Sequence, residues 1–184
     1  MQKSALIIGI IFILISGVHA QTTFRTKFME GHYTYILNPS VNFNGEKVNT
    51  SQFGAGVNLN VGTEHISSIL EYSFTRMNMK NLKNGAGPIN NHEFYLGLRY
   101  YPMKPTFLIG RTALRITAGA AGGLDLEPNW RAMIFCGFHL SPILDSSGLA
   151  IYLVYRPGKH SVGGYEQQPT WAIRISAVLG VSAK

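Results

Sequence analysis

The feature that most constrains this chain is a period-two alternation of apolar residues with small or polar ones. In residues 53–61, Phe53, Val57 and Leu59 fall on one face of an extended chain, while glycines and asparagines fall on the other. Successive side chains of a β-strand point to opposite faces, so this pattern predicts a strand. The same alternation recurs at residues 28–37, 70–75, 93–101, 114–121, 132–140, 149–156 and 171–181. None of these segments carries a 3.6-residue stripe, and the sequence predicts an all-β protein of eight strands.

Composition limits the class of protein further. The 184 residues are 46% hydrophobic and 14% charged, which argues against a disordered chain and allows one domain or one membrane-embedded unit. The single cysteine excludes an internal disulfide and any site built from several cysteines. All 8 prolines fall between the alternating segments, as expected for a residue that cannot donate to a sheet ladder.

The composition of the polar face indicates which side of the sheet meets solvent. That face is rich in Gly, Ala, Ser, Thr and Asn and holds few charges, whereas a water-facing sheet would carry many. Small residues with sparse charges fit the crowded interior of an eight-stranded barrel. Segments of about ten residues, with aromatic residues toward their ends, also suit tilted strands that cross a bilayer. We therefore expect a closed antiparallel eight-stranded transmembrane β-barrel, apolar outside. The alternative is a secreted, soluble, lipocalin-like barrel that binds an apolar ligand, with the Phe53, Val57 and Leu59 face inward.

The connections between the strands agree in part with a membrane barrel, which pairs short turns at one end with longer external loops at the other. Residues 38–50, 78–92 and 157–169 are long and polar, and residues 63–65 form a tight turn. Two connections fit less well. Residues 103–111 are long for a turn, unless 107–109 extend the fifth strand, and residues 124–130 are short for an external loop.

The first twenty residues are predicted to be a secretory signal peptide. Lys3 gives a positive start, residues 6–15 are almost wholly apolar, and Val18 and Ala20 occupy small-residue cleavage positions. The apolar run is too short for a transmembrane helix, which needs about 20 residues. The expected organisation is a signal peptide at 1–20 and a barrel domain at 21–184.

Taken together, the signal peptide, residues 53–62, 96–101 and 116–124 and the final strand at 171–181 resemble the small eight-stranded outer-membrane β-barrels, such as OmpX-like proteins and the membrane domain of OmpA-like proteins. The resemblance covers the whole mature chain. It implies a bacterial outer-membrane location, insertion by the barrel-insertion machinery and contact with outer-membrane lipids. These barrels often end in an aromatic residue, whereas this sequence ends in Ala183 and Lys184.

The inward parity predicts an ionic network that plugs the lumen, because buried charges must be paired. Its predicted members are Glu30, Glu71, Glu93, Arg99, Arg115, Arg156 and Arg174. A narrow conduit or small-solute site is the alternative, but eight strands enclose too little space for a water-filled pore.

A second candidate site lies at the outer rim. Arg76 has the lipid-facing parity, and Lys80 and Lys83 follow in the next loop. These cations could contact lipopolysaccharide phosphates, since charge-assisted phosphate contacts are strong; solvated loop lysines are the alternative.

The sequence gives no catalytic or metal site, and we expect a protein that is not an enzyme and needs no cofactor. Lipid A deacylases resemble this chain in size, and their His-x-Ser-Asn motif is approached only by His160 and Ser161, with Glu166 later. Adjacent strand residues point to opposite faces, which separates base from nucleophile. The remaining histidines lack metal-ligand spacing.

The basic balance of +7 can suggest nucleic acid, but an exported barrel with scattered cations makes that partner a remote one. We expect a structural or interaction protein of the outer membrane instead. Its recognition role would belong to the loops at 38–50, 78–91 and 157–169, because loops vary on a fixed scaffold. The sequence leaves the partners of these loops open.

Overall fold

The computed structural model describes residues 25–43, 46–62, 65–79, 87–101, 107–109, 112–127, 129–142, 147–162 and 165–180. Every regular element within these ranges is a β-strand. No helix in the described ranges is long and apolar enough to cross a membrane. The predicted signal peptide lies outside the described residues, so the division into 1–20 and 21–184 stays a prediction.

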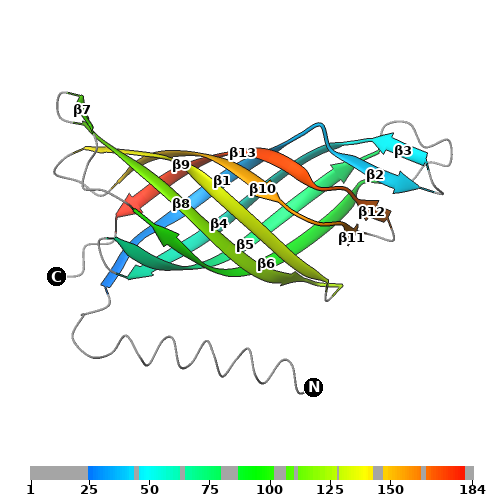
Figure 1. The fold of residues 1–184 in the computed structure, drawn as a ribbon, viewed down its shortest axis with the longest axis horizontal. Helices are drawn as coiled ribbons and strands as arrows, with labels where there is room; N and C mark the ends of the chain where they lie inside the picture. Colours follow the sequence, from blue (N-terminus) through cyan, green and yellow to red (C-terminus); the bar gives the residue numbers. More distant parts are fainter. Residues whose placement is uncertain are drawn as a thin grey trace, which may run out of the picture.

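Eight long strands of the described chain form the barrel wall (Figure 1). They are β1 (Arg25–Leu37), β4 (Ser51–Gly62), β5 (Ile66–Asn78), β6 (Ile89–Tyr100), β8 (Thr112–Asp125), β9 (Trp130–Pro142), β10 (Gly148–Arg156) and β13 (Thr170–Gly180). Each strand pairs antiparallel with its neighbours in the order β6-β5-β4-β1-β13-β10-β9-β8, and β6 pairs with β8. This last pairing closes the sheet on itself, which removes the free edges that an open sheet would expose.

The barrel has two different ends. At one end, which we call the sheet end, β2 (Ser40–Phe43), β3 (Glu46–Asn49), β11 (His160–Val162) and β12 (Tyr165–Gln167) form a separate four-stranded sheet, the second sheet (Figure 1). At the other, the terminal end, β1 begins and β13 ends. The second sheet joins two hairpins through pairing of β12 with β2.

The prediction that residues 38–50 and 157–169 are only connections is wrong, because they contain the four short strands of the second sheet. Segments of three or four residues are too short to display an alternating pattern. At the terminal end, β7 (Phe107–Ile109) pairs antiparallel with Thr112–Leu114 of β8. The residues at 107–109 therefore form a separate short strand that lines up against the fifth long strand rather than continuing it.

The predicted alternation of inward and outward faces is confirmed along the long strands. Large apolar side chains such as Leu70, Leu98 and Ile134 are 59%, 57% and 54% exposed on the outer surface. Their sequence neighbours of opposite parity lie inside the barrel, where Glu71 and Arg99 are each 1% exposed. The soluble alternative required Val57 and Leu59 to point inward, and it is wrong because both are exposed outside.

The small residues of the wall make room for aromatic side chains inside the barrel. Phe135 and Tyr152 meet edge to face with ring centroids 5.7 Å apart, and both are buried. A Cβ atom on Gly119 would lie only 2.3 Å from the Phe135 ring and 2.5 Å from the Leu98 carbonyl oxygen. Glycine at this position thus permits a large ring to fill the lumen, in keeping with a closely packed interior.

Candidate functional site

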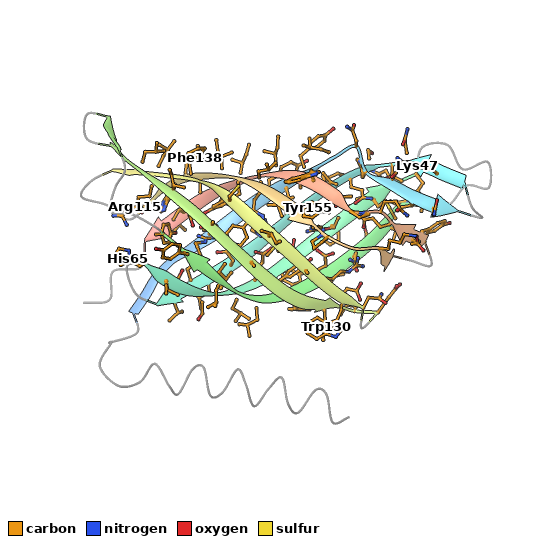
Figure 2. All side chains as sticks on the ribbon, viewed as in Figure 1. Lys47, His65, Arg115, Trp130, Phe138 and Tyr155 are labelled. Atoms are coloured by element: carbon orange, nitrogen blue, oxygen red, sulfur yellow. The ribbon has the colours of Figure 1, made fainter. Side chains whose placement is uncertain are left out.

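The barrel interior holds three groups of paired acidic and basic side chains, which follow one another from the terminal end to the sheet end. Figure 2 shows the side chains on the ribbon. The acids are Glu30, Glu71, Glu93 and Asp125, and the bases are Arg99, Arg131, Arg156 and Arg174. All of these residues are buried. Because the four carboxylates and four guanidinium groups balance, the formal charges of this set cancel.

The first group, nearest the terminal end, is centred on Glu30 of β1. Arg99 of β6 forms an ion pair with this carboxylate and donates hydrogen bonds to both of its oxygens. The carboxylate also accepts a 2.8 Å hydrogen bond from the Tyr152 hydroxyl and a 3.0 Å hydrogen bond from the Asn58 amide. The Arg99 guanidinium lies 5.1 Å from the Tyr152 ring centroid and 5.4 Å from that of Phe135, within cation–π range. These hydrogen bonds and ring contacts therefore offset the desolvation cost of burying the two charges.

The second group joins Glu71 of β5 to Arg174 of β13 across the lumen. The two guanidinium nitrogens donate one hydrogen bond of 2.8 Å to each carboxylate oxygen, which is the strong bidentate arrangement. His32 Nε2 lies 3.5 Å from the same carboxylate. Arg174 also donates to the Thr34 hydroxyl at 3.3 Å. Strands β1, β5 and β13 are thus tied together through their side chains as well as their backbones.

The third group, nearest the sheet end, contains two arginines and two acids. Arg156 of β10 lies 3.1 Å from a Glu93 oxygen, and Arg131 Nε lies 3.9 Å from the other oxygen of that carboxylate. Arg131 also donates a 3.0 Å hydrogen bond to Asp125. The Asp125 carboxylate accepts backbone N–H groups from Glu127 at 3.0 Å and from Asn129 at 2.9 Å. This carboxylate holds together the short turn between β8 and β9.

The predicted ionic set and the observed groups differ at three positions. Six of the seven predicted residues are buried and paired as described, but Arg115 is exposed. It has the inward parity, and it lies at the terminal end of β8, opposite His139 (Figure 2). Exposure at this mouth removes the need for a buried partner. Sequence analysis missed Asp125, which it placed in a loop, and Arg131, whose inward parity with Met133 was the available signal.

At the sheet end of the lumen, apolar and amide side chains form buried contacts between the barrel wall and the second sheet. Val41 of the second sheet packs with Met77 and Met79 in a buried cluster, and Val48, Ile89 and Tyr165 surround it. Gln167 donates a 2.8 Å hydrogen bond to Gln52 just inside this cluster. The second sheet therefore does more than extend the wall, because Val41 and Gln167 make buried contacts with side chains of β5 and β4.

The predicted rim site is described only in part. Arg76 lies on β5, half-buried, with its backbone opposite Phe53 of β4 and Asn90 of β6. It shares the outward parity of Tyr72, as predicted. Lys80 and Lys83 lie outside the described residues, so the structure does not bring the three cations together or separate them.

The described residues hold no group of three or more His, Cys, Asp or Glu side chains that could bind a metal ion. Cys136 is exposed on the outer face of β9. His160 and Ser161 are consecutive residues of β11, with their backbones opposite Gln167 and Glu166 of β12. His92 lies outside the lumen, where its Nδ1 and the Tyr72 hydroxyl are 2.7 Å apart.

The outer surface carries an apolar belt of membrane-spanning height. On β13 the exposed side chains run from Trp171, 49% exposed, to Leu179, 56% exposed. Eight residue steps of about 3.3 Å, tilted by about 40°, rise about 20 Å, close to the apolar band of membrane barrels. At the sheet end of this belt the rings of Trp171 and Tyr155 lie 4.6 Å apart, and Trp130 is 63% exposed. Tyr100 is exposed near the terminal end. Aromatic residues at both margins are typical of interfacial girdles.

Comparison with known proteins identifies structures of similar architecture. Neisserial surface protein A (NspA) matches with a TM-score of 0.46 and 9% identity over 88% of this chain and 100% of that chain. Ail, the attachment invasion locus protein of Yersinia pestis, matches with a TM-score of 0.41 and 12% identity over 83% of this chain and 97% of that one. The de novo designed barrel TMB2.3 gives a TM-score of 0.42 and 11% identity, covering 86% and 97% of the two chains. No protein-family model and no curated protein matches the sequence.

The architecture follows from the geometry of this chain itself. Soluble proteins rarely expose a continuous apolar belt, and they do not enclose their ionised side chains while doing so. A closed wall of this kind places apolar side chains against the lipid tails and paired charges inside, and its strands provide a hydrogen-bond partner for the backbone groups of their neighbours. The predicted fold is confirmed: this protein is an all-β, closed, antiparallel eight-stranded transmembrane β-barrel, the fold of the small outer-membrane barrel proteins.

Proposed function

We propose that this protein is a non-enzymatic barrel of the bacterial outer membrane, with a plugged lumen and with its second sheet and loops outside the cell for recognition or adhesion. The observation that carries the proposal is the combination of a balanced, buried ionic network with an apolar outer belt. A wall of this kind gives a rigid support, and variation is left to the segments at its sheet end.

The packing of the lumen supports a plug rather than a channel. Ion pairs or hydrogen bonds cross the interior at Glu30, Glu71 and Glu93, and the buried Val41 cluster lies at the sheet end. A permeating ion would have to displace buried, bidentate hydrogen bonds, each of which is strong in a low-dielectric interior. In planar bilayers we expect the purified protein to show no steady conductance, and a stable open level would contradict a plugged lumen.

The second sheet is proposed as the surface that meets other molecules. Its polar side chains Asn42, Lys47 and Glu166 point away from the buried cluster and lie on neighbouring strands. Residues 38–50 and 157–169, which the sequence marked for recognition, contribute these strands. Arg76, Lys80 and Lys83 remain a proposed lipopolysaccharide contact at the rim, and outer-membrane lipids and the barrel-insertion machinery remain the proposed partners.

Orientation in the membrane can be tested by cysteine labelling in whole cells. In a Cys136→Ser background, Glu166→Cys places a thiol on the second sheet, and His65→Cys places a matched exposed thiol at the terminal end (His65 is labelled in Figure 2). A membrane-impermeant maleimide should label Glu166→Cys in intact cells and His65→Cys only after lysis.

Two results would contradict the proposal, one from labelling and one from cell fractionation. Labelling of His65→Cys alone in intact cells would reverse the proposed orientation. Recovery of the protein in the soluble fraction, without a heat-dependent change in gel migration, would contradict the membrane location itself.

A further inference from the structure

A recess opens on the outer surface where the barrel wall meets the second sheet. β1 pairs with β4 only as far as Tyr35 and Phe53, and the chain then turns at Asn38, which has a φ of 44°. Beyond the turn, Pro39 accepts a 2.9 Å backbone hydrogen bond from Thr50. The divergence of the second sheet from the wall leaves a cavity of about 300 Å³.

The residues around this cavity favour an anionic, hydrogen-bonding ligand. The lining includes Lys47, the amides of Asn38 and Asn49, and the hydroxyl residues Thr50 and Ser51, and none of the lining residues is acidic. Lys47 is exposed and takes part in no ion pair within the described ranges. The Thr50 hydroxyl already donates to the Pro39 carbonyl oxygen at 3.3 Å. The ammonium group of Lys47, with the two amides and the Ser51 hydroxyl, provides the charge and the donors that a phosphate group requires.

The position of the recess indicates where such a ligand would come from. Its floor includes Tyr35, which is 53% exposed at the sheet end of the apolar belt. Tyr33, one step further into the belt, is 50% exposed and stacks on Phe53 at 6.3 Å. Aromatic side chains at the margin of a belt lie at the level of lipid head groups. The cavity therefore opens beside the head groups while the belt below it faces acyl chains.

We propose that this recess binds the phosphate-bearing head group of one lipid of the surrounding leaflet. Lys47 contacts the phosphate, and Tyr35 lies against the part of the lipid where the head group joins the acyl chains. The volume is at the lower end of small-molecule sites, which suits a single head group. This inference rests on the proposed membrane location and orientation. It is distinct from the rim contact at Arg76, which lies on β5.

The test measures bound lipid on the intact protein by native mass spectrometry after purification in detergent. The probe is lipid A with its phosphates, compared with the same lipid after enzymatic dephosphorylation. Lys47→Ala should weaken binding roughly tenfold, as expected for loss of one charge-assisted contact. Lys47→Arg should retain binding. Lys159→Ala is the matched control, because Lys159 lies near the same sheet but pairs with Glu166 at 2.8 Å.

Each result decides the inference. Wild-type protein should bind dephosphorylated lipid about as weakly as Lys47→Ala binds the intact lipid. Equal binding of both lipids, or unchanged binding by Lys47→Ala, would overturn the site. Full displacement by millimolar inorganic phosphate would overturn a lipid as its ligand. Heat-dependent gel migration and whole-cell labelling report folding and location separately, so a correctly inserted protein with unchanged lipid binding refutes only this inference.

Discussion

The Glu30–Arg99 pair offers a quantitative test of the lumen energetics. Its two side chains are 0% and 2% exposed, so neither charge has access to bulk water when its partner is removed. Breaking a buried pair costs about 3–5 kcal/mol, most of it from the charge left behind. Removal of both charges should therefore cost much less than the sum of the two single changes.

The groups around the pair determine which of the two single substitutions costs more unfolding free energy. In Arg99→Met, the Glu30 carboxylate keeps only its neutral donors, Tyr152 and Asn58, and the contacts of the guanidinium with two rings are lost. We expect a loss of about 4 kcal/mol in the free energy of unfolding. In Glu30→Gln, the guanidinium stays between the rings and the amide oxygen still accepts hydrogen bonds. The expected loss there is about 3 kcal/mol.

The double variant completes the thermodynamic cycle. We expect Glu30→Gln with Arg99→Met to lose about 4–5 kcal/mol, which gives a coupling of about 2–3 kcal/mol between the two residues. Equilibrium urea unfolding in lipid vesicles, followed by tryptophan fluorescence, measures each value. The exposed Lys159–Glu166 pair provides a control in which a much smaller coupling is expected, because both of its charges stay in contact with water. Additive losses near 7 kcal/mol for the lumen pair would refute the reasoning.

Two further predictions concern packing and pH. Gly119→Val should lower the free energy of unfolding by about 2–3 kcal/mol, because the new side chain must displace the Phe135 ring. Gly31→Ala is the control and should be nearly neutral, because a Cβ atom at Gly31 would meet no atom within 4 Å. Urea unfolding compares the two variants, and equal losses would contradict the packing argument. On the second sheet, a hydrogen bond from Lys159 lowers the pKa of Glu166, so the stabilisation from this contact is present above the ordinary glutamate pKa and is lost as pH falls through the lowered pKa. An NMR titration should find the pKa of Glu166 raised toward its ordinary value in Lys159→Ala, and an unchanged pKa would contradict that cause.

The alternation of the sequence determined which side chains share a face, and therefore most of the fold. Leu70 and Glu71 are neighbours in the chain, and strand geometry alone places them on opposite sides of the wall. The residue types on the two faces then indicated that the apolar side faces lipid. The second sheet escaped prediction because three- and four-residue strands have no measurable period, and because the pairing of β12 with β2, which joins its two hairpins, links residues far apart in the sequence.

The partners inside the lumen were decided only by the tertiary structure. The sequence could state that Glu71 and Arg174 both point inward, but their meeting depends on the stagger of every strand around the closed barrel. Arg131 meets Asp125 across the short turn between β8 and β9, and the sequence did not show that this turn would fold back onto the lumen. Arg115 has the same inward parity but lies exposed at the terminal end. Parity is a local property of one strand, whereas the height of a side chain in the lumen is a property of the whole sheet.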